Sequence, residues 1–403
     1  MKNLSRREFV KISSILSASL FVPKFIKSAK AEQFINKYSA NGNILVVIQL
    51  SGGNDGLNTV IPYYNDIYYK NRPGIAIEKS KVLKLNDYLG LNPNMSDLIK
   101  LYDEGYLKII NNVGYPNPDR SHFRSMDIWQ SASDSNEYIN TGWIGRYLDS
   151  GCNGCEFPHK AIEVDGTLSL AMKGEHQSGL AMQDAKRFVF NAKDGLIEKI
   201  SESNKNISSG NENHDYLYKV LNDTYSSVNA VAKHYSKATT KGNYPKNDFS
   251  NNLKSIASLI NSGIDTNVYY LSLSGFDTHT NQINTQNNLL KIYSEGIKAF
   301  CDDLKSGGKL NNVMIITFSE FGRRVSENGS KGTDHGTANN VFLISGKLSE
   351  PGVDNSNPDL QKLDEGDLIF KTDFRSVYAS ILEKWLNADS KAILGKKFPL
   401  INI

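Results

Sequence analysis

The chain has 403 residues, 39% of them hydrophobic and 22% charged, with a formal net charge of +3. This length can bury a large core, either as one large domain or as two smaller ones. Lysine and arginine are concentrated in residues 1–31, so the remainder is slightly acidic and lacks the basic footprint of a protein that binds nucleic acid. No apolar stretch of about twenty residues follows residue 31, so we predict no transmembrane segment in the mature chain.

Residues 1–31 have the pattern of a twin-arginine export signal. The run Ser5-Arg6-Arg7-Glu8-Phe9-Val10-Lys11 precedes a modestly apolar stretch, and Ala29-Lys30-Ala31 supplies a cleavage site with small residues at both ends. A basic amphipathic membrane anchor is the alternative. The signal predicts the twin-arginine translocase as a partner during export, and a location in the periplasm or cell envelope. We interpret residues 32–43 as a linker.

Uninterrupted apolar runs predict the strands of a buried sheet. Such runs are required where helices cover both faces of a parallel sheet. We expect strands at 44–50, 107–113, 268–274, 313–318 and 341–345. Amphipathic segments predict helices at 96–104, from 121 or 122 onward, at 281–305 and at 373–386. Together they predict an α/β fold with a doubly wound, mostly parallel sheet in one domain over residues 44–403.

The spacing of apolar residues predicts which face of two helices is buried. In the helix that starts near residue 121, we expect Phe123, Met126 and Trp129 to face the core. In the helix at 281–305, the expected core stripe is Ile283, Leu290, Tyr293, Ile297, Phe300 and Leu304. Asp373 is placed to cap the last helix.

Two regions interrupt this alternation of strands and helices. Residues 185–245 are polar and partly helical, which predicts a cap insertion over the ligand-binding edge of the sheet, or a solvated surface segment. Cys152 and Cys155 lie in a loop rich in Gly and Asn, which favours a structural disulfide or an incidental pair over a redox or zinc site. Cys301 is then left free.

Acidic and histidine residues adjoin the predicted strands and form a candidate metal site. In parallel sheets ligands lie beyond the carboxyl ends of the strands, so side chains distant in sequence meet at one edge. The predicted metal ligands are Asp55, Asp277, His279, Glu320, Asp334 and His335. Mixed carboxylate and imidazole ligands suit one or two ions of zinc, manganese or iron, and leave magnesium open. Two alternatives stay open: Asp55 in an Asx turn, and Glu320 in a salt bridge with Arg323 or Arg324.

A hydrolase also needs a nucleophile, and the start of a helix favours one. Ser121 meets the free N–H groups and positive dipole end of the predicted helix, and His122 beside it is grouped with it as catalytic. A plain N-cap role is the alternative for Ser121. Thr59 is the second choice of nucleophile, and a metal-bound hydroxide is the third. Arg323 or Arg324 is expected to bind an oxyanion, because a guanidinium forks onto two oxygens.

The motifs around these residues resemble domain-of-unknown-function family 1501. Besides the export signal, the blocks that carry the resemblance are 50–59, 120–129, 141–146, 275–279, 319–323 and 333–339, which span nearly the whole mature chain. That family resembles the alkaline phosphatase and sulfatase superfamily, which implies an alkaline-phosphatase-like fold, two metals between strand ends and a nucleophile at a helix start. By this resemblance Asp55 matches the metal-binding Asp after the first strand, and Ser121 matches the region of the nucleophile. Asp277 and His279 match an Asp-plus-His pair, and His335 the late histidine.

The chain departs from the superfamily at Glu320-Phe321, where an adjacent Asp-His is usual. Glu320 can still bind a metal but Phe321 cannot, so either Asp334 compensates or one metal site is lost. We expect an exported metal-dependent hydrolase of phosphate or sulfate esters, with an envelope glycan, a lipid or another small molecule as substrate. The alternative, which Phe321 favours, is a non-catalytic envelope protein that keeps the fold for binding or assembly.

Overall fold

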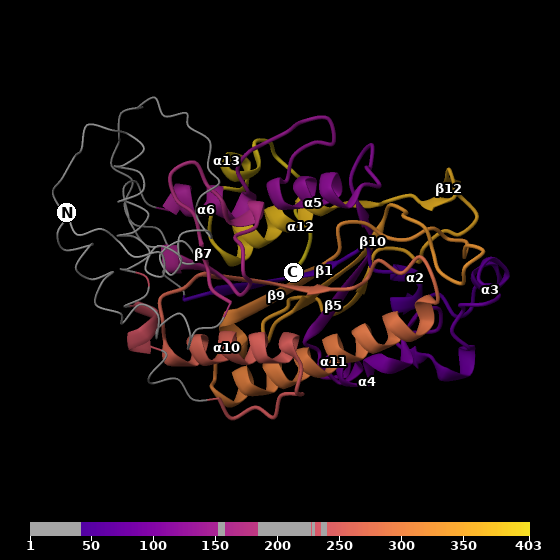
Figure 1. The fold of residues 1–403 in the computed structure, drawn as a ribbon, viewed down its shortest axis with the longest axis horizontal. Coiled ribbons are helices and arrows are strands. Elements are labelled where there is room, and N and C mark those ends of the chain that lie inside the picture. The colour runs from indigo at the N-terminus through magenta and orange to yellow at the C-terminus, as the bar shows by residue number, and fades with distance from the viewer. Residues whose placement is uncertain (1–41, 152–157, 184–226, 228–229, 235–239) are drawn as a thin grey trace, which may run out of the picture.

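The computed structural model describes residues 42–151, 158–183, 227, 230–234 and 240–403. The predicted export signal, most of the linker and most of the cap insertion lie outside these residues, as do Cys152 and Cys155. Helices cover both faces of a central sheet, so the described chain forms three layers (Figure 1). The predicted α/β class is confirmed.

Within the described residues, the central sheet has nine strands in the order β11-β5-β10-β9-β1-β8-β6-β7, with β14 paired to β5. Their bounds are β1 Ile44–Ser51, β5 Leu107–Gly114, β6 Ala161–Glu163, β7 Leu180–Ala181, β8 Val268–Ser274, β9 Val313–Phe318, β10 Asn339–Ile344, β11 Gly352–Asp354 and β14 Thr372–Asp373. Neighbouring strands are parallel except at β10, which is antiparallel to both β5 and β9. The sheet is therefore mostly parallel, as predicted.

The reversed direction of β10 brings an upstream segment to the site. Because β10 runs against its neighbours, it begins at the edge where β5 and β9 end. Asp334 and His335, which precede this strand, thus reach the same edge as the residues that follow β1, β8 and β9. In a parallel β10 they would lie at the opposite edge of the sheet.

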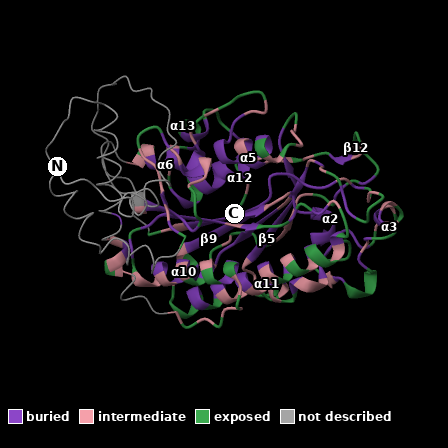
Figure 2. Cartoon of the chain, viewed as in Figure 1, coloured by how far each residue is buried: buried purple, intermediate pink, exposed green. Residues whose placement is uncertain are grey.

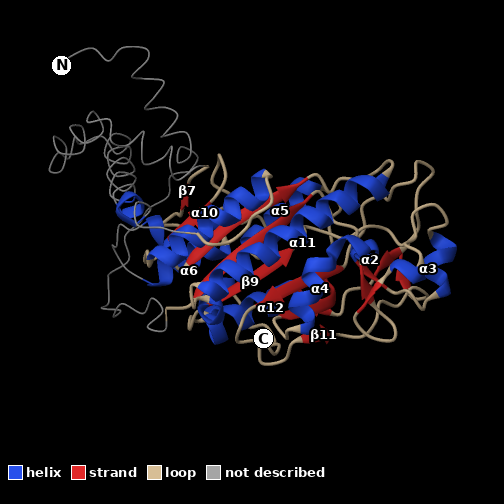
Figure 3. Cartoon of the chain, turned by 90° about the horizontal axis from the view of Figure 1, so that it is seen from below, coloured by secondary structure: helices blue, strands red, loops and turns tan. Residues whose placement is uncertain are grey.

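Side chains along β1 alternate between two cores, as the two-residue period of a strand requires. Leu45 and Val47 belong to one apolar cluster, while Val46, Ile48 and Leu50 belong to the other. The first cluster is covered by α5 His122–Ser131, α6 Trp143–Gly151, α12 Phe374–Ser380 and α13 Ser390–Leu394. The second is covered by α4 Ser96–Asp103, α10 Asp248–Ser262 and α11 Gln282–Ser306. Figure 2 shows buried residues along the strands and exposed ones on the outer helix surfaces, and Figure 3 shows α4, α10 and α11 lying across the strands.

The longest predicted helix is confirmed together with its core stripe. It is α11, and five of the six predicted residues are fully buried, while Ile283 is partly buried. Complete burial of one Leu, Ile or Phe side chain is worth about 1.5–3 kcal/mol, so this stripe fixes the helix firmly on the sheet. The predicted C-terminal helix is α12, whose N-cap Asp373 accepts from the backbone N–H of Arg375, and a π-helical turn over Ile381–Trp385 continues it.

The predicted buried face of α5 is wrong. Phe123 is 86% exposed and Met126 is only partly buried, although Trp129 is buried as expected. The buried residues of the helix are Arg124, Ser125, Ile128, Trp129, Gln130 and Ser131. The Trp129 ring stacks between Phe318 and Phe374, with ring centroids 4.8 Å and 4.3 Å away, and this packing fixes the rotation of the helix.

Smaller elements complete the described chain. One short sheet contains β2 Val60–Ile61, β4 Gly90–Leu91 and β3 Leu83–Lys84, and another contains β12 Leu363–Asp364 and β13 Asp367–Leu368. Two short helices, α2 Gly56–Thr59 and α3 Asp66–Asn71, follow β1. Cys301 on α11 is buried and free, as predicted. None of the described helices combines the length and the apolar character needed to cross a membrane.

Candidate metal centre

Three histidines and one aspartate converge beyond the carboxyl edge of the sheet. The Oδ1 atom of Asp277 lies 3.5 Å from Nε2 of His122, 3.1 Å from Nε2 of His279 and 3.4 Å from Nε2 of His335. The Nε2 atoms of His279 and His335 are 2.9 Å apart. We call these four residues the His–Asp cluster. His122, which the sequence placed among the catalytic residues, is thus part of a candidate ligand set with three of the six predicted ligands.

Close backbone packing fixes the loop that carries two of these residues. The β8 strand turns at Gly275, where φ is +110°, and then reaches Asp277 and His279. Gly52, at the end of β1, has a φ of +117°, and a Cβ atom there would lie 2.4 Å from the backbone nitrogen of Asp277. Only glycine permits this approach of two backbones. The conformation at Gly52 therefore positions Asp277 against the rigid sheet.

Each histidine of the cluster has a second partner at Nδ1. His122 Nδ1 lies 2.9 Å from Oε1 of Glu320, and His279 Nδ1 lies 3.2 Å from Oδ1 of Asp334. His335 Nδ1 lies 2.7 Å from the carbonyl oxygen of Arg120. A carbonyl or an ionised carboxylate only accepts hydrogen bonds, so each Nδ1 carries the proton and donates it. In the neutral form of each ring, the lone pair is then on Nε2 and points into the cluster.

The cluster has the donor set of a metal site. Two Nε2 lone pairs facing each other at 2.9 Å, as in His279 and His335, repel unless a proton or a cation lies between them. The Nε2 atom of His122 is buried and has no hydrogen-bond partner. One divalent cation would satisfy the ligand atoms of His122, Asp277 and His335, which all lie within 4.8 Å of one another, and the Nε2 atom of His279 adjoins two of them. Backing of the ligand histidines by carboxylates and a carbonyl is also typical of metal sites.

Glu320 and Asp334, two of the predicted metal ligands, lie behind the cluster and accept hydrogen bonds from its histidines. Glu320 is fully buried, and its Oε1 atom accepts both from His122 and from the backbone N–H of Gly52 at 2.8 Å. The hydrogen bond to Glu320 is the main cause of a raised pKa at His122. Asp334 accepts from Asn328 and His279, and these hydrogen bonds lower the pKa of its carboxyl. Glu320 pairs with His122 and forms no salt bridge with Arg323 or Arg324, which was the alternative left open by the sequence.

Arg323 is a structural residue of the site and not a free anion-binding group. Its guanidinium, 0% exposed, donates to Oδ1 of Asp277 at 2.7 Å. The same guanidinium donates to the carbonyl oxygens of Gly52, Gly53, Phe276 and Thr333. Burial alone would raise the pKa of Asp277. Arg323 and the cluster histidines have the opposite and larger combined effect, and they lower this pKa to about 2. Arg324 is different, because its side chain is 41% exposed and its nearest acid, Asp367, is 3.9 Å away.

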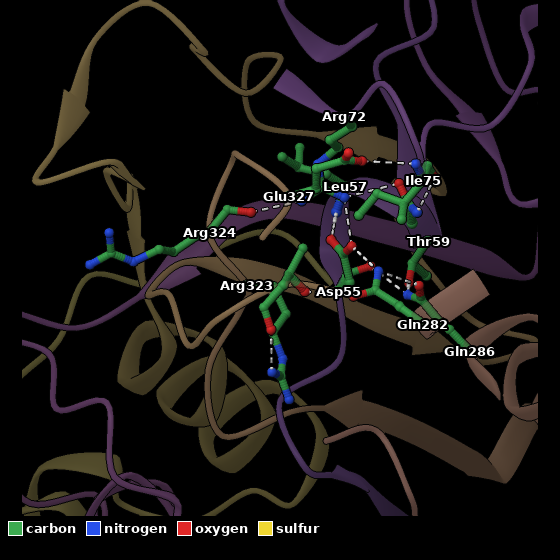
Figure 4. A network of polar contacts seen from close by, with 12 residues as sticks. Asp55, Leu57, Thr59, Arg72, Ile75, Gln282, Gln286, Arg323, Arg324 and Glu327 are labelled. Atoms are coloured by element: carbon green, nitrogen blue, oxygen red, sulfur yellow. Dashed lines mark hydrogen bonds and ion pairs between the residues drawn. The ribbon is translucent and has the colours of Figure 1, made fainter. Parts of the chain in front are cut away.

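Asp55 and Thr59, at the end of β1, have structural partners. One oxygen of Asp55 accepts from the backbone N–H of Leu57 at 3.1 Å, which is the Asx-turn alternative left open by the sequence. The other accepts from Arg72 and from Gln282, each at 2.5 Å (Figure 4). Both Asp55 and Arg72 have fully buried side chains. Thr59 is also fully buried and donates to the backbone of Asp55, so its hydroxyl is not accessible as a nucleophile.

Ser121 is exposed and lies between Arg120 and His122, each of which takes part in the contacts of the cluster. It precedes α5 as the N-cap residue, but its hydroxyl makes no capping hydrogen bond, so the plain N-cap alternative does not describe this side chain. Its backbone N–H donates to Oδ1 of Asp119 at 2.7 Å. On one side Arg120 accepts from His335, and on the other His122 belongs to the cluster itself. The Ser121 hydroxyl is therefore a free group beside the candidate metal ligands.

Phe321 forms a wall of the site at the position where the sequence lacked a ligand. Its ring is buried, with its centroid 4.8 Å from that of His122 and 4.7 Å from that of His335. It also fills the space beside Gly53, where a Cβ would lie 2.2 Å from the ring. His122 of α5 places an imidazole beside this ring and within the cluster. A sequence signal for this role existed, since His122 opens a helix that follows the carboxyl end of β5.

A known protein family matches a segment of the chain that contains part of this site. A family model described as a protein of unknown function, DUF1501, matches residues 204–354. The predicted resemblance to that family is confirmed over this span, which contains Asp277, His279 and His335 but not His122. No curated protein matches the sequence.

Several solved structures are distantly similar to the chain. A protein in the alkaline phosphatase superfamily from Vibrio parahaemolyticus is 10% identical, covers 91% of this chain and 72% of that chain, and has a TM-score of 0.42. The PsFucS1 sulfatase from Pseudoalteromonas sp. is 12% identical over 98% of this chain and 72% of that chain, with a TM-score of 0.38. The C-terminal periplasmic domain of EcEptC from Escherichia coli, in complex with Zn, is 10% identical over 79% and 78%, with a TM-score of 0.32. The neighbours thus include members of the superfamily implied by the family resemblance, while the interpretation of the site rests on its own residues.

Proposed function

We propose that the protein is an exported hydrolase of phosphate or sulfate esters that uses one divalent metal ion. The observation that carries the proposal is the His–Asp cluster, in which three imidazole nitrogens face one carboxylate oxygen at 3.1–3.5 Å. Each of the three imidazoles is oriented by a separate acceptor behind it. Several lone pairs and a charge placed this close together repel one another, so the arrangement is energetically unfavourable unless a cation binds among them.

The ligand chemistry favours zinc and a single ion. Three imidazoles and one carboxylate suit zinc, with manganese and iron as the next candidates. A second ion would need Asp55, Glu320 or Asp334, and each of these carboxylates already accepts hydrogen bonds from neighbouring groups. When bound, the ion would act as a Lewis acid that polarises an oxygen of the ester.

The remaining groups have roles in binding and attack. In our proposal the Ser121 hydroxyl attacks phosphorus or sulfur and forms a serine ester, and its proton passes to the alcohol oxygen as the bond to the alcohol breaks. Water then hydrolyses the serine ester and restores the hydroxyl of Ser121. The first backbone N–H groups of α5 stabilise negative charge on the transferred group. Arg324, whose guanidinium is 41% exposed, is the candidate to bind a substrate oxygen in place of the buried Arg323.

Metal analysis of the purified mature protein tests the first part of the proposal. We expect about one equivalent of divalent metal in the wild type and much less after His279→Ala together with His335→Ala. His176→Ala is the matched control, because this exposed histidine lies outside the cluster. Unchanged metal content in the double variant, or no bound metal in wild type folded with zinc, would contradict the proposal.

The chemistry is tested on a panel of phosphate and sulfate monoesters. Ser121→Ala is expected to retain the metal and to lose turnover by at least about a hundredfold, as expected for loss of a nucleophile. If the variant turns over at the wild-type rate, the covalent route is wrong. If metal-loaded wild type hydrolyses no ester of the panel, the alternative of a non-catalytic binding protein gains support.

Export is the part of the proposal that rests on the sequence alone. Lysine substitution of both Arg6 and Arg7 is expected to leave the protein in the cytoplasm, whereas the wild-type signal delivers it to the periplasm or envelope. Cell fractionation with the unmodified signal as the control measures this. Equal periplasmic amounts of both forms would contradict use of the twin-arginine translocase.

A further inference from the structure

Two arginine side chains meet at the turn of one hairpin beside the His–Asp cluster. The hairpin is β12–β13, and its turn consists of Glu365 and Gly366, with φ of +50° and +92°. Arg120 donates from Nε and Nη2 to Oδ2 of Asp367, at 2.8 Å and 2.5 Å. The Nε atom of Arg324 lies 3.9 Å from Oδ1 of the same carboxylate. One buried aspartate therefore joins both guanidiniums.

Backbone contacts attach both arginines to the cluster. The carbonyl oxygen of Arg120, the residue before the candidate nucleophile, accepts from Nδ1 of His335 at 2.7 Å. The backbone N–H of Arg324 donates to the carbonyl oxygen of Asp334 at 3.1 Å, and the Asp334 side chain accepts from His279. Each guanidinium is therefore within one side-chain length of the backbone that supports the cluster.

Neither guanidinium uses all of its five N–H donors. The side chains of Arg120 and Arg324 are 36% and 41% exposed. The Arg324 guanidinium donates no hydrogen bond within the described part of the chain, and Figure 4 shows it extending away from the buried network around Asp55. Nη1 and Nη2 of Arg120 face Oε2 of Glu365, each at 3.5 Å, but the Glu365 side chain is 74% exposed. The hairpin thus holds two guanidiniums with donors open to solvent.

An anion is the ligand that these donors suit. A guanidinium forks onto two oxygens, and a phosphate, sulfate or carboxylate presents at least two. The carboxylate of Glu365 already lies at the open edge of Arg120, but at the limit of hydrogen-bond distance, so an external anion can take its place with better geometry. A cation would instead be repelled by two guanidinium charges that share one buried carboxylate.

We propose that Arg120 and Arg324, positioned by Asp367, bind a second anionic group of the substrate. The preferred esters then carry a phosphate, sulfate or carboxylate besides the group that is hydrolysed. The inference rests on the proposed function, in which the cluster and the first N–H groups of α5 serve the transferred group. Because both guanidiniums contact the hairpin beside the cluster, their ligand is a different group from the one at the metal.

Equilibrium binding tests the inference without depending on turnover. The protein is the zinc-loaded mature chain carrying Ser121→Ala. Titration calorimetry compares alkanediol bisphosphates of two to six carbons with the monophosphates of the same diols, and the bissulfates with the monosulfates. We expect at least one of these bis-esters to bind about tenfold more tightly than its mono-ester, as added charge-assisted hydrogen bonds allow.

Three variants assign the preference to the hairpin. Arg324→Gln should remove it, because the fork that holds the second anion is lost. Glu365→Gln should increase it, because the carboxylate that competes for Arg120 loses its charge. Lys81→Gln is the matched control, since it also removes one positive charge, here from an exposed ion pair with Glu78. A purely structural role of the arginines would not give the increase in Glu365→Gln.

The possible results separate this inference from the function on which it rests. Zinc-dependent binding with equal affinity in every pair overturns the second anion site and leaves the proposed function standing. A preference that survives Arg324→Gln does the same, and if both affinities of a pair fall by one factor, Arg324 binds the transferred group. Absence of zinc-dependent binding by every ester overturns both. Because the Arg324 side chain is 41% exposed, its replacement should leave the melting temperature unchanged.

Discussion

At the scale of single residues, Asp277 links the groups of the site. Its Oδ1 atom contacts all three cluster histidines and the guanidinium of Arg323. Because Arg323 is fully buried and its side chain also holds four carbonyl oxygens, the position of the carboxylate is set by a group that cannot move. With a pKa of about 2, Asp277 stays ionised throughout the neutral pH range and can bind a cation without first losing a proton.

The clearest prediction at this scale concerns Glu320, which positions His122 and does not reach the metal in our proposal. Glu320→Ala removes the acceptor for both His122 Nδ1 and the backbone N–H of Gly52, so we expect a 10–100-fold weaker zinc affinity, roughly the cost of losing such a partner. Glu320→Gln retains an oxygen acceptor and should recover most of this loss. Competition with a zinc-binding dye measures the affinities. If Gln is as damaging as Ala, Glu320 acts as a charged ligand and the positioning role is wrong.

At the scale of elements, the end of β1 is tied to the rest of the site by a buried ion pair. Arg72, which ends α3, donates to Asp55, to Asn58 and to the carbonyl oxygens of Arg324 and Val325. Figure 4 shows Arg72 and Gln282 directed at Asp55, while the Arg324 side chain extends away from it. This network joins the turn after β1 to the segment that precedes β10. Within it, both oxygens of Asp55, a predicted metal ligand, already accept hydrogen bonds.

The consequence is a prediction about stability that leaves the metal untouched. Arg72→Met would leave Asp55 charged and buried without its partner, so the free energy of unfolding should fall by about 3–5 kcal/mol. The metal content of the folded variant should remain near one equivalent. Urea unfolding and metal analysis measure the two quantities, with Lys81→Met as a control because the ion pair of Lys81 is exposed. Loss of the metal in folded Arg72→Met would show that Asp55 is coupled to the site.

The sequence predicted the elements of the fold better than the contacts within the site. Strands such as β1 and β9 are recognisable because a buried parallel strand must be apolar throughout. The direction of β10 and the partners of Glu320 depend on long-range packing, which no local pattern records. The predicted rotation of α5 about its own axis was wrong for the same reason. Phe123 has apolar spacing with Trp129, but stacking of Trp129 on Phe318 and Phe374 determines which face is inward.

At the scale of the whole molecule, one sheet with two cores holds residues from distant parts of the sequence at a single edge. Residues 122 and 335 belong to one site because β5 and β10 are neighbours in the sheet. Burial within this sheet also affects Glu163, which ends β6, is paired in register with Tyr270 of β8 and is only 3% exposed. A carboxyl in this position links the protonation of one residue to the stability of the entire fold.

Glu163 therefore predicts how stability depends on pH. Burial, opposed by hydrogen bonds from Ser169, raises its pKa from 4.5 to about 8 in the folded chain, so the folded state holds a proton that the unfolded state releases. The stability from this group is complete below about pH 4.5 and falls as pH rises toward 8, by at most about 5 kcal/mol. Glu163→Gln keeps the shape without the titration. Its free energy of unfolding should exceed that of the wild type by a margin that grows between pH 5 and 8 and is then constant, as measured by urea unfolding at each pH. The exposed Glu78→Gln should show no such trend, and a margin that does not vary with pH would mean that Glu163 is ionised in the folded protein.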